Sequence, residues 1–444
     1  MPNVAVVGGG MMGLTLGLRL AQRGHRVRVY EGSAAVGGLA SADRIGEWKW
    51  DRFYHVILQS DTALTGLLGE VGLKDRLRWG TTRTGFYVDG RWISLSSAPE
   101  FLRFPPLNLV DKSRLAATIL MASRISDPLP LENMGALEWL RRWSGKRTTE
   151  RIWEPLLRAK LGDNAKDASA AFIWAIIARM YAARRTGLKR EMMGYVTGGY
   201  DAILPAVRRY AERAGVEIVN GAMVTGVRDE GAGAVVTVDG AGSAVFDHAI
   251  LTVSCPIVSR LCPQLGDAEH DRLARVVYQG VVCPSWLLSR PLPGFYVTNI
   301  TERWVPFTGV IETTALVDRS AFGGNTLVYL PRYLTQRDGM WNWSDEQVSI
   351  EFFAALCHMV PGLTPSHIVA SRVARARDVL AVSTHRYTTD VMPPLETSLP
   401  NVFIANSAQI AHGTLNVNET ISLAERQAQI LHSRFATRTQ VVAA

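Results

Sequence analysis

The first apolar residues of the chain predict a strand, a helix and a second strand in close succession. Residues 4–7 are continuously apolar, which is typical of a short strand buried on both faces. Leucines then recur from Leu14 to Leu20 in a segment of helical character, and residues 25–31 read as a second strand after Gly24. This order indicates a βαβ unit, in which the two strands run parallel in one sheet.

Later parts of the chain carry patterns that extend this sheet. Residues 197–210 predict an amphipathic helix that opens at a glycine pair, and the last periodic segment carries Ile421, Leu423 and Ala424 on a second helix. Further strands are predicted at 215–219, 222–227, 234–238, 246–252 and 401–407, with a hairpin turn at Asp239-Gly240.

Two long stretches interrupt this pattern. Residues 76–194 are rich in helix signals, apart from a predicted hairpin whose turn is Asp89-Gly90. Residues 271–380 alternate like a β-sheet, with strand candidates at 296–297, 310–311 and 327–330. We expect the two stretches together to form one domain. Because the sequence shows no internal repeat, low-complexity tract or clear linker, we also expect this domain to share an extended interface with the rest of the chain.

The loop of the first βαβ unit has the spacing G-x-G-x-x-G. Gly8 permits the tight turn, Gly10 lets a pyrophosphate approach the backbone, and Gly13 lets helix and strand pack closely. Met12 lies inside this loop, and the helix that follows directs its free N–H groups toward phosphate. Glu31 ends the second strand, where a carboxylate binds the ribose hydroxyls and repels a 2′-phosphate. The spacing predicts a dinucleotide site that disfavours NADP.

The segment after Glu31 narrows the choice of dinucleotide. Residues 32–40 contain the doublet Gly37-Gly38, and at this point the chain resembles the flavoprotein superfamily of flavin amine oxidases, protoporphyrinogen oxidases, phytoene desaturases and UDP-galactopyranose mutases. The resemblance implies FAD, with the doublet against the pyrophosphate and ribityl region. Leu39 stands where the family commonly has arginine, which leaves one phosphate contact unassigned.

Four further residues receive a cofactor role through the same resemblance. The residue matching Val224 contacts the adenine side through its backbone. Asn406 stands where many members have an aspartate after a glycine, so an amide contact would replace a carboxylate contact. Asn416 and Asn418 begin the closing helix, which the family directs at the flavin or its ribityl chain; either asparagine could instead only cap a helix.

The resemblance implies an α/β fold, in which a discontinuous Rossmann-type FAD-binding domain carries an inserted α+β substrate domain with a mixed sheet plus helices. We expect residues 1–75, 195–270 and 381–444 to form the FAD-binding domain, and residues 76–194 and 271–380 to form the substrate-binding domain.

Composition and charge argue against several classes of binding partner. The 444 residues are 47% apolar and 20% charged, and no run of about eighteen uncharged apolar residues appears, so a membrane-spanning helix is not expected. The net charge of +8 is scattered, which argues against nucleic acid as a partner. The four cysteines have no CxxC spacing, so no metal site is expected. The first residues show no targeting features, and we expect a cytoplasmic protein.

Candidate catalytic residues lie in two segments. Residues 51–55 (DRFYH) stand where many relatives carry D-x-G-x-H at the edge of the isoalloxazine, with Phe53 in place of glycine. His55 is the best candidate for an acid, a base or a hydrogen-bond donor; the alternative is a half-buried histidine fixed by a backbone partner. Tyr329, Arg332 and Tyr333 could face the substrate, with the arginine holding an anionic group, although a structural role at a strand end is equally consistent.

The function expected from the resemblance is that of an FAD-dependent oxidoreductase, an oxidase or desaturase that takes hydride from a C–C or C–N bond of a fairly apolar small molecule. Typical flavin amine oxidases carry a lysine near flavin N5 in the later half of the chain. This sequence has no lysine after Lys189, so the resemblance gives less support to ordinary amine oxidation than to the other reactions of the family. The alternatives are a non-redox isomerase of sugar nucleotides, as in UDP-galactopyranose mutase, and a flavin-binding protein without turnover.

One predicted helix has features that are compatible with a contact to a membrane surface. Residues 168–185 carry an apolar stripe that includes Ile173 and Ile177, add Trp174, and end in a basic cluster. Such a helix could lie on a membrane surface and admit a lipid-like substrate. A buried helix with a basic end is the other interpretation, and in an enzyme of this size it is the commoner one.

Overall fold

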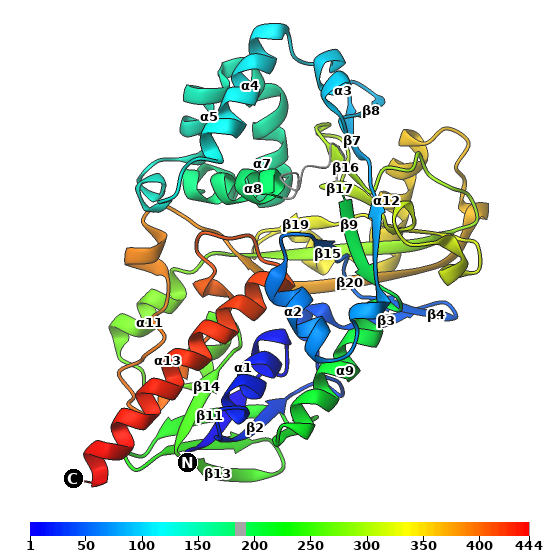
Figure 1. Cartoon of the computed structure of the whole chain (residues 1–444). Helices are drawn as coiled ribbons and strands as arrows, with labels where there is room; N and C mark the ends of the chain where they lie inside the picture. The colour runs from blue at the N-terminus through cyan, green and yellow to red at the C-terminus, as the bar shows by residue number, and fades with distance from the viewer. Residues whose placement is uncertain (183–191, 444) are drawn as a thin grey trace.

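The structure, a computed structural model, describes residues 1–182 and 192–443. A five-stranded parallel sheet forms the lower half of Figure 1, with strand order β10-β2-β1-β14-β21. Its first unit consists of β1 (Asn3–Val7), α1 (Met11–Ala21) and β2 (Arg26–Glu31), as the hydrophobic pattern predicts. The remaining strands come from distant parts of the chain: β10 (Val216–Asn220), β14 (His248–Leu251) and β21 (Val402–Ile404).

Both faces of this sheet are covered, which explains the continuous apolar run in β1. Val4 and Val6 face a core formed with α1, α9 (Gly199–Arg213) and α13 (Val417–Ala443). Ala5 and Val7 face a second core on the other side of the sheet. That side is covered by the antiparallel strands β11 (Val224–Asp229), β12 (Ala234–Val238) and β13 (Gly242–Phe246), and by α10 (Cys255–Leu261) and α11 (Asp267–Ala274).

The second sheet is mixed and has eight strands, in the order β19-β15-β18-β17-β16-β7-β8, with β20 paired to β15. The predicted hairpin of the first insertion, β7 and β8, joins this sheet because β7 pairs in parallel with β16. The two insertions therefore share one sheet. Its strands are β7 (Thr84–Val88), β8 (Arg91–Ser94), β15 (Tyr278–Leu288), β16 (Val297–Ile300), β17 (Gly309–Glu312), β18 (Thr326–Tyr329), β19 (Arg332–Leu334) and β20 (Ile368–Ala381).

A group of helices lies above this sheet in Figure 1. It contains α3 (Ala98–Arg103), α4 (Leu109–Ala122), α5 (Ala136–Ser144), α6 (Lys146–Thr148), α7 (Glu154–Leu161) and α8 (Ala170–Ala182). Ile173 and Ile177 of α8 are buried in the core of this group, and the Trp174 indole donates to the Ala122 carbonyl. Ile173 and Ile177 of the apolar stripe therefore face protein, which agrees with the buried-helix interpretation, whereas Met180 of the same helix is exposed. The basic end of this segment, residues 184–190, lies outside the described residues.

Smaller elements connect the two halves. They are β3 (Ala42–Ile45), β4 (Trp48–Asp51), β5 (Ile57–Leu58), α2 (Thr62–Glu70), β6 (Leu77–Thr81) and β9 (Met192–Val196). The helix α12 (Asp345–Met359) instead packs on the second sheet. β9 pairs with both β5 and β6, beside the positions at which the sequence places domain boundaries. The boundaries themselves stay a prediction. No helix within the described ranges is long and apolar enough to cross a bilayer.

Some elements differ from the sequence prediction. The predicted strand 246–252 is divided at Asp247, whose N–H donates to the Asn3 carbonyl, so that β13 ends and β14 begins around it. The long strands β15 and β20 were not predicted, and α12 interrupts a region that was expected to be β-sheet. Every residue of β15 is buried, so the strand lacks the alternation that marks a half-exposed strand.

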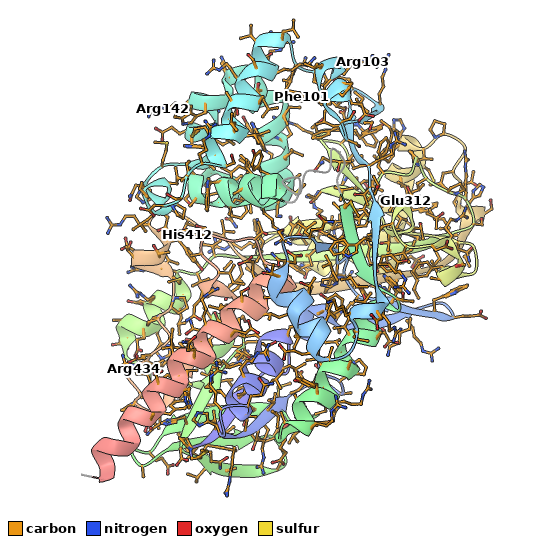
Figure 2. The ribbon with its side chains drawn as sticks, viewed as in Figure 1. Phe101, Arg103, Arg142, Glu312, His412 and Arg434 are labelled. Carbon is orange, nitrogen blue, oxygen red and sulfur yellow. The ribbon has the colours of Figure 1, made fainter. Side chains whose placement is uncertain are left out.

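A buried acid lies in the second sheet. Glu312 ends β17 and is only 5% exposed, and its carboxylate accepts the Gly294 N–H at 2.9 Å. Figure 2 shows it within the body of the molecule. Burial raises the pKa of this carboxyl from 4.5 to about 7, because the hydrogen bonds from the 292–294 backbone only partly replace the lost water.

The buried Glu312 should make the free energy of unfolding fall as the pH rises. Below pH 4.5 the group is protonated in both states, but between that value and about pH 7 only the unfolded chain releases the proton, which favours unfolding. The free energy of unfolding is expected to fall by about 3 kcal/mol across this pH range. Glu312→Gln should remove most of it, whereas Glu351→Gln, at an exposed position of α12, should not. Urea unfolding across the window measures this, and an unchanged pH dependence in Glu312→Gln would contradict it.

Candidate active site

The glycine loop after β1 is closely packed in the way that its spacing predicts. Gly8 has a φ of +109° and donates its N–H to the Tyr30 carbonyl of β2. A Cβ on Gly13 would lie 1.9 Å from the Gly8 carbonyl oxygen, so only glycine permits this contact between helix and loop. Gly10 is the N-cap of α1, and no side chain caps that end. The N–H groups of the first helical turn are therefore available to phosphate oxygens.

Glu31 lies at the end of β2, beside this loop. Its Oε2 accepts the Gly9 N–H at 2.8 Å and its Oε1 accepts the Ser33 N–H at 2.8 Å. Each carboxylate oxygen can accept a second hydrogen bond, so the group retains capacity for two hydroxyl donors. The side chain is partly exposed, which leaves it accessible to a ribose.

The glycine doublet lies against the same loop. The Gly37 N–H donates to the Gly9 carbonyl at 2.9 Å, and Gly37 and Gly38 have φ values of +131° and +54° that favour glycine. Leu39 follows in a short 3-10 helix and remains partly exposed. Met12 is buried in the core on the α1 side, so a cofactor contact at this position would have to use its backbone.

Val224 begins β11 at the same edge of the parallel sheet as Glu31. The preceding backbone is attached there, because the Ala222 N–H donates to the Glu31 carbonyl at 2.9 Å. The exposed Met223 side chain lies over Gly32. This places the Val224 backbone near the predicted ribose and adenine end, which agrees with the expected contact without testing it.

The three predicted asparagines hydrogen bond within the protein. Asn406 is buried, and its Nδ2 donates to the Val253 carbonyl at 2.8 Å. Asn416 is the N-cap of α13 and accepts the Glu419 N–H at 3.0 Å. Asn418 does not cap its own helix: its Oδ1 accepts the N–H groups of residues 63 and 64, at the start of α2. Flavin contacts through these side chains stay a prediction, and their visible role is to fix the loops.

His55 lies in a pocket too small for a substrate. Its ring is 4.7 Å from that of Tyr200, and Nδ1 is 3.6 Å from Asp51 Oδ2, beyond hydrogen-bond distance. The cavity bounded by these residues and by Tyr296 has a volume of about 20 Å³, which is room for about one water molecule. The side chain is mostly buried, and a role for it at the substrate stays a prediction.

Tyr329 and Arg332 also make structural contacts. Tyr329 is completely buried, and its hydroxyl donates to the Asp51 carbonyl at 2.6 Å. Arg332 donates from Nη1 to the Pro306 carbonyl at 2.9 Å. The geometry supports the strand-end role for both, and substrate contact through either side chain is an untested prediction.

Five partly exposed side chains belong to the clusters in which the second sheet meets the helices. The hydroxyl groups of Tyr54 and Tyr333 lie 2.9 Å apart, and both side chains remain partly exposed although burial raises their pKa values. Val379 of β20 is also partly exposed and belongs both to the core of the second sheet and to the core of the helices. Leu39 and Leu415 are partly exposed members of the same two clusters.

The sequence indicated Tyr333 together with Tyr329 and Arg332, but it did not indicate Tyr54. Tyr54 is the immediate neighbour of the predicted His55. Because successive side chains of an extended segment point to opposite sides, the choice between neighbours requires the tertiary structure.

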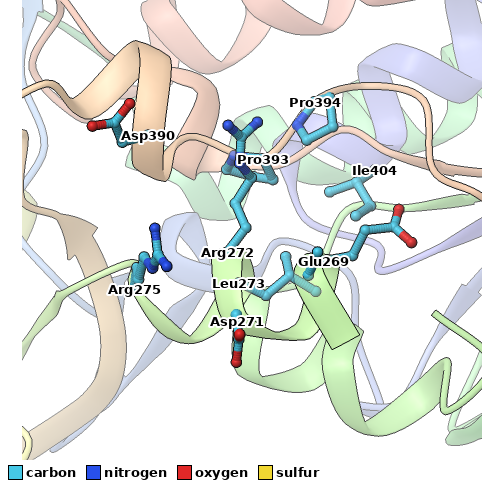
Figure 3. Close-up of a pocket in the computed structure, with 10 residues that line it drawn as sticks. Glu269, Asp271, Arg272, Leu273, Arg275, Asp390, Pro393, Pro394 and Ile404 are labelled. Carbon is cyan, nitrogen blue, oxygen red and sulfur yellow. The ribbon is translucent and has the colours of Figure 1, made fainter. Parts of the chain in front are cut away.

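A different cavity lies on the other side of the nucleotide-binding domain. It has a volume of about 510 Å³, and Figure 3 shows Arg272, Arg275 and Asp390 around it. Arg272 donates to the Thr389 carbonyl at 2.6 Å, so its guanidinium is engaged in the wall. The cavity is formed by α11 and the segment before β21, away from the glycine loop.

The glycine loop, the doublet, Glu31 and the two-domain fold together define an FAD-binding protein. The family model described as flavin containing amine oxidoreductase matches residues 11–432. The chain belongs to this family of flavin-containing amine oxidoreductases, which indicates FAD as its cofactor.

Curated relatives match only part of the chain. Protoporphyrinogen oxidase 2 of Arabidopsis thaliana is 25% identical over 167 residues, which is 35% of this chain and 32% of the relative. Zeta-carotene desaturase of Solanum lycopersicum is 25% identical over 216 residues, or 43% and 37% of the two chains. The match thus spans little more than a third of the length of these relatives.

Solved structures match almost throughout. A protein of Exiguobacterium sp. 255-15, described as a candidate protoporphyrinogen oxidase, has a TM-score of 0.77 at 18% identity over 98% of this chain and 99% of its own. Reduced UDP-galactopyranose mutase has a TM-score of 0.73 at 15% identity over 97% and 95% of the two chains. Likeness at this level of identity shows the fold alone, and it confirms the predicted FAD-binding architecture.

FAD fits the residues that are present. The uncapped N-terminus of α1 and the glycine backbone around it form a cradle for the pyrophosphate, and a Cβ at Gly13 would move that loop. Glu31 would hold the ribose hydroxyls from the edge of the sheet.

Gly13→Ala should therefore reduce FAD affinity by about tenfold or more, since the added Cβ must displace the Gly8 carbonyl and the N–H groups beside it. Gly66→Ala is the matched control, because this glycine lies in α2 with no atom within 4 Å of an added Cβ. Flavin absorbance of the dialysed proteins measures the effect, and circular dichroism checks that both variants fold. Full FAD content in folded Gly13→Ala would contradict the predicted cradle.

Proposed function

We propose that this protein is an oxidase or desaturase that removes hydride from a C–C or C–N bond of a fairly apolar small molecule. The main supporting observation is the partial exposure of Tyr54, Tyr333, Val379, Leu39 and Leu415, from which we infer an inner recess between the second sheet, the helices and the loop before α13. Aromatic and aliphatic side chains that keep partial exposure inside a fold offer apolar surface to a substrate.

The recess adjoins the segments to which the flavin is assigned. Leu39 directly follows the glycine doublet, and Leu415 precedes the N-cap of α13. Bound FAD would accept the hydride, so the protein must position the substrate bond and exclude water from it. Tyr54 and Tyr333 would border the substrate on the side of the second sheet, since their hydroxyls hold each other in place.

The names of the relatives suggest which compounds to test. They include a protoporphyrinogen oxidase and a zeta-carotene desaturase, so protoporphyrinogen and zeta-carotene are the first compounds to test. The UDP-galactopyranose mutase neighbour keeps the isomerase as the alternative.

Anaerobic flavin spectroscopy distinguishes these functions. We expect zeta-carotene or protoporphyrinogen to bleach the flavin band of the purified protein without another reductant. Putrescine, the ligand of another structural neighbour, serves as the polar comparison. If none of these bleaches the band, and UDP-galactopyranose rearranges only after the flavin is reduced with dithionite, the proposal is wrong and the isomerase is right.

We further propose a peripheral membrane contact, at a place other than α8. Leu102, Leu109 and Val110 are 60%, 73% and 66% exposed at the end of α3 and the start of α4. Arg103 directly follows Leu102 at the end of α3, and Figure 2 shows it at the edge of the helical group. Exposed apolar side chains next to an arginine suit the headgroup region of an anionic bilayer.

This contact predicts that the protein sediments with vesicles that contain phosphatidylserine. Leu109→Glu together with Val110→Glu should abolish most of the binding, because two exposed apolar groups become charges of the same sign as the lipid. The matched control is Ile350→Glu, an equally exposed apolar residue on α12. Equal sedimentation of the double variant and the control would reject the contact.

A further inference from the structure

Lys160 is a charged side chain inside the fold without a charged partner. It lies in the last turn of α7, and its Nζ makes no hydrogen bond or ion pair with any residue in the described ranges. Its Nζ lies over the ring of Tyr333, at 5.6 Å from the ring centroid. Burial lowers the pKa of the Lys160 ammonium, although the side chain keeps some exposure. An unpaired ammonium in such a place is costly, so it calls for a partner that is not part of the chain.

The backbone on either side of Lys160 is fixed to the second sheet. The Ala159 carbonyl accepts the Thr308 hydroxyl at 2.8 Å, and the Leu161 carbonyl accepts the side-chain N–H of the fully buried Gln279. These contacts hold the end of α7 over β19. The packing of this helix on the sheet therefore sets the position of Lys160 above Tyr333.

The contacts of Tyr333 connect Lys160 to the proposed substrate recess. Its hydroxyl is 2.9 Å from that of Tyr54, and Tyr54 lies next to Phe53 in the segment assigned to the flavin edge. Arg332, the neighbour of Tyr333, donates to the Pro306 carbonyl. Alternation along β19 directs Arg332 and Tyr333 to opposite sides, so Lys160 is the cation on the Tyr333 side.

We propose that Lys160, over the Tyr333 ring, binds a carboxylate of the substrate, so that the substrate class is an apolar molecule that carries an acid group. This inference rests on the proposed function, because it places the apolar part of that molecule in the same recess toward Tyr54. A carboxylate there gains a charge-assisted hydrogen bond in surroundings poor in water, where such bonds are strong. A cationic amine would meet a charge of its own sign, and a neutral substrate would leave the ammonium unpaired.

Three probes of one shape test this charge preference on the FAD-loaded protein. Benzoate, benzylammonium and benzyl alcohol share an aromatic ring that suits the tyrosines and differ in charge. Calorimetry measures their binding, and perturbation of the flavin absorption provides a second readout. We expect benzoate to bind most tightly of the three to the wild-type protein.

Variants assign the preference to Lys160. Lys160→Met should weaken benzoate binding by about tenfold or more, because one charge-assisted hydrogen bond is lost. Lys160→Arg should restore much of the affinity by keeping the charge. Lys166→Met is the matched control, since this lysine is exposed shortly after α7, and it should bind benzoate like the wild type.

The outcomes separate this inference from the proposed function. The flavin band of Lys160→Met is recorded first, and we expect it to equal that of the wild type. With that band intact, unchanged benzoate affinity in Lys160→Met rejects the carboxylate site alone. Preference of the wild type for benzylammonium, or no benzoate binding to it, also rejects the site. Loss of the proposed function would appear elsewhere, as a flavin that none of the apolar compounds reduces.

Discussion

The hydrogen bonds around Asp51 fasten the second sheet to the nucleotide-binding domain. The Asp51 carboxylate accepts the Tyr200 N–H at the start of α9 at 2.6 Å, while its backbone carbonyl accepts the Tyr329 hydroxyl and an N–H of Arg372. Arg372 also donates to the Asp43 carbonyl, so one guanidinium holds the β3–β4 hairpin against β20. Hydrogen bonds of charged groups contribute about 1.5–3 kcal/mol each, and removal of one partner would leave the others buried and unsatisfied. The inner recess depends on this joint, because its two tyrosines come from the segment after β4 and from β19.

The joint also explains why several polar residues do not face the open space. The Tyr329 hydroxyl is already engaged, because it donates to the Asp51 carbonyl. His55 lies beside Tyr200, in a cavity with room for about one water molecule. Tyr54 and Tyr333 keep their exposure, and Lys160 approaches from the helices. The proposed active site thus has a helix N-terminus for phosphate at one end and a lysine for a carboxylate at the other. Both ends favour anions, with apolar side chains between them.

The parts of the fold that the sequence predicted are those whose signals are local. The βαβ unit, the hairpin at Asp89-Gly90 and the helix from Gly199 each follow from neighbouring residues, through periodicity, turn chemistry and glycine sterics. The strand β15 was not predicted because its burial on both faces comes from covering elements far away in the chain. The strand β20 is mostly half-exposed or exposed, and its strand character depends on its pairing with β15. Asn418 shows the same limit for a side chain. Its sequence position suggests a cap for its own helix, but it binds the N–H groups at the start of α2, more than three hundred residues earlier.

The sequence by itself determined the dinucleotide-binding βαβ unit, because the glycines of the loop and the carboxylate at Glu31 act within one continuous segment whose backbone geometry they set. FAD and the wider architecture followed from the resemblance to a known family. Only the tertiary structure decided which side chains border the substrate recess. Tyr54, Lys160 and Tyr333 lie in three separate parts of the chain, and the choice between Tyr54 and His55, or between Tyr333 and Arg332, depends on which side of an extended segment is covered. Long-range packing fixes that side, and no pattern within a single segment records it.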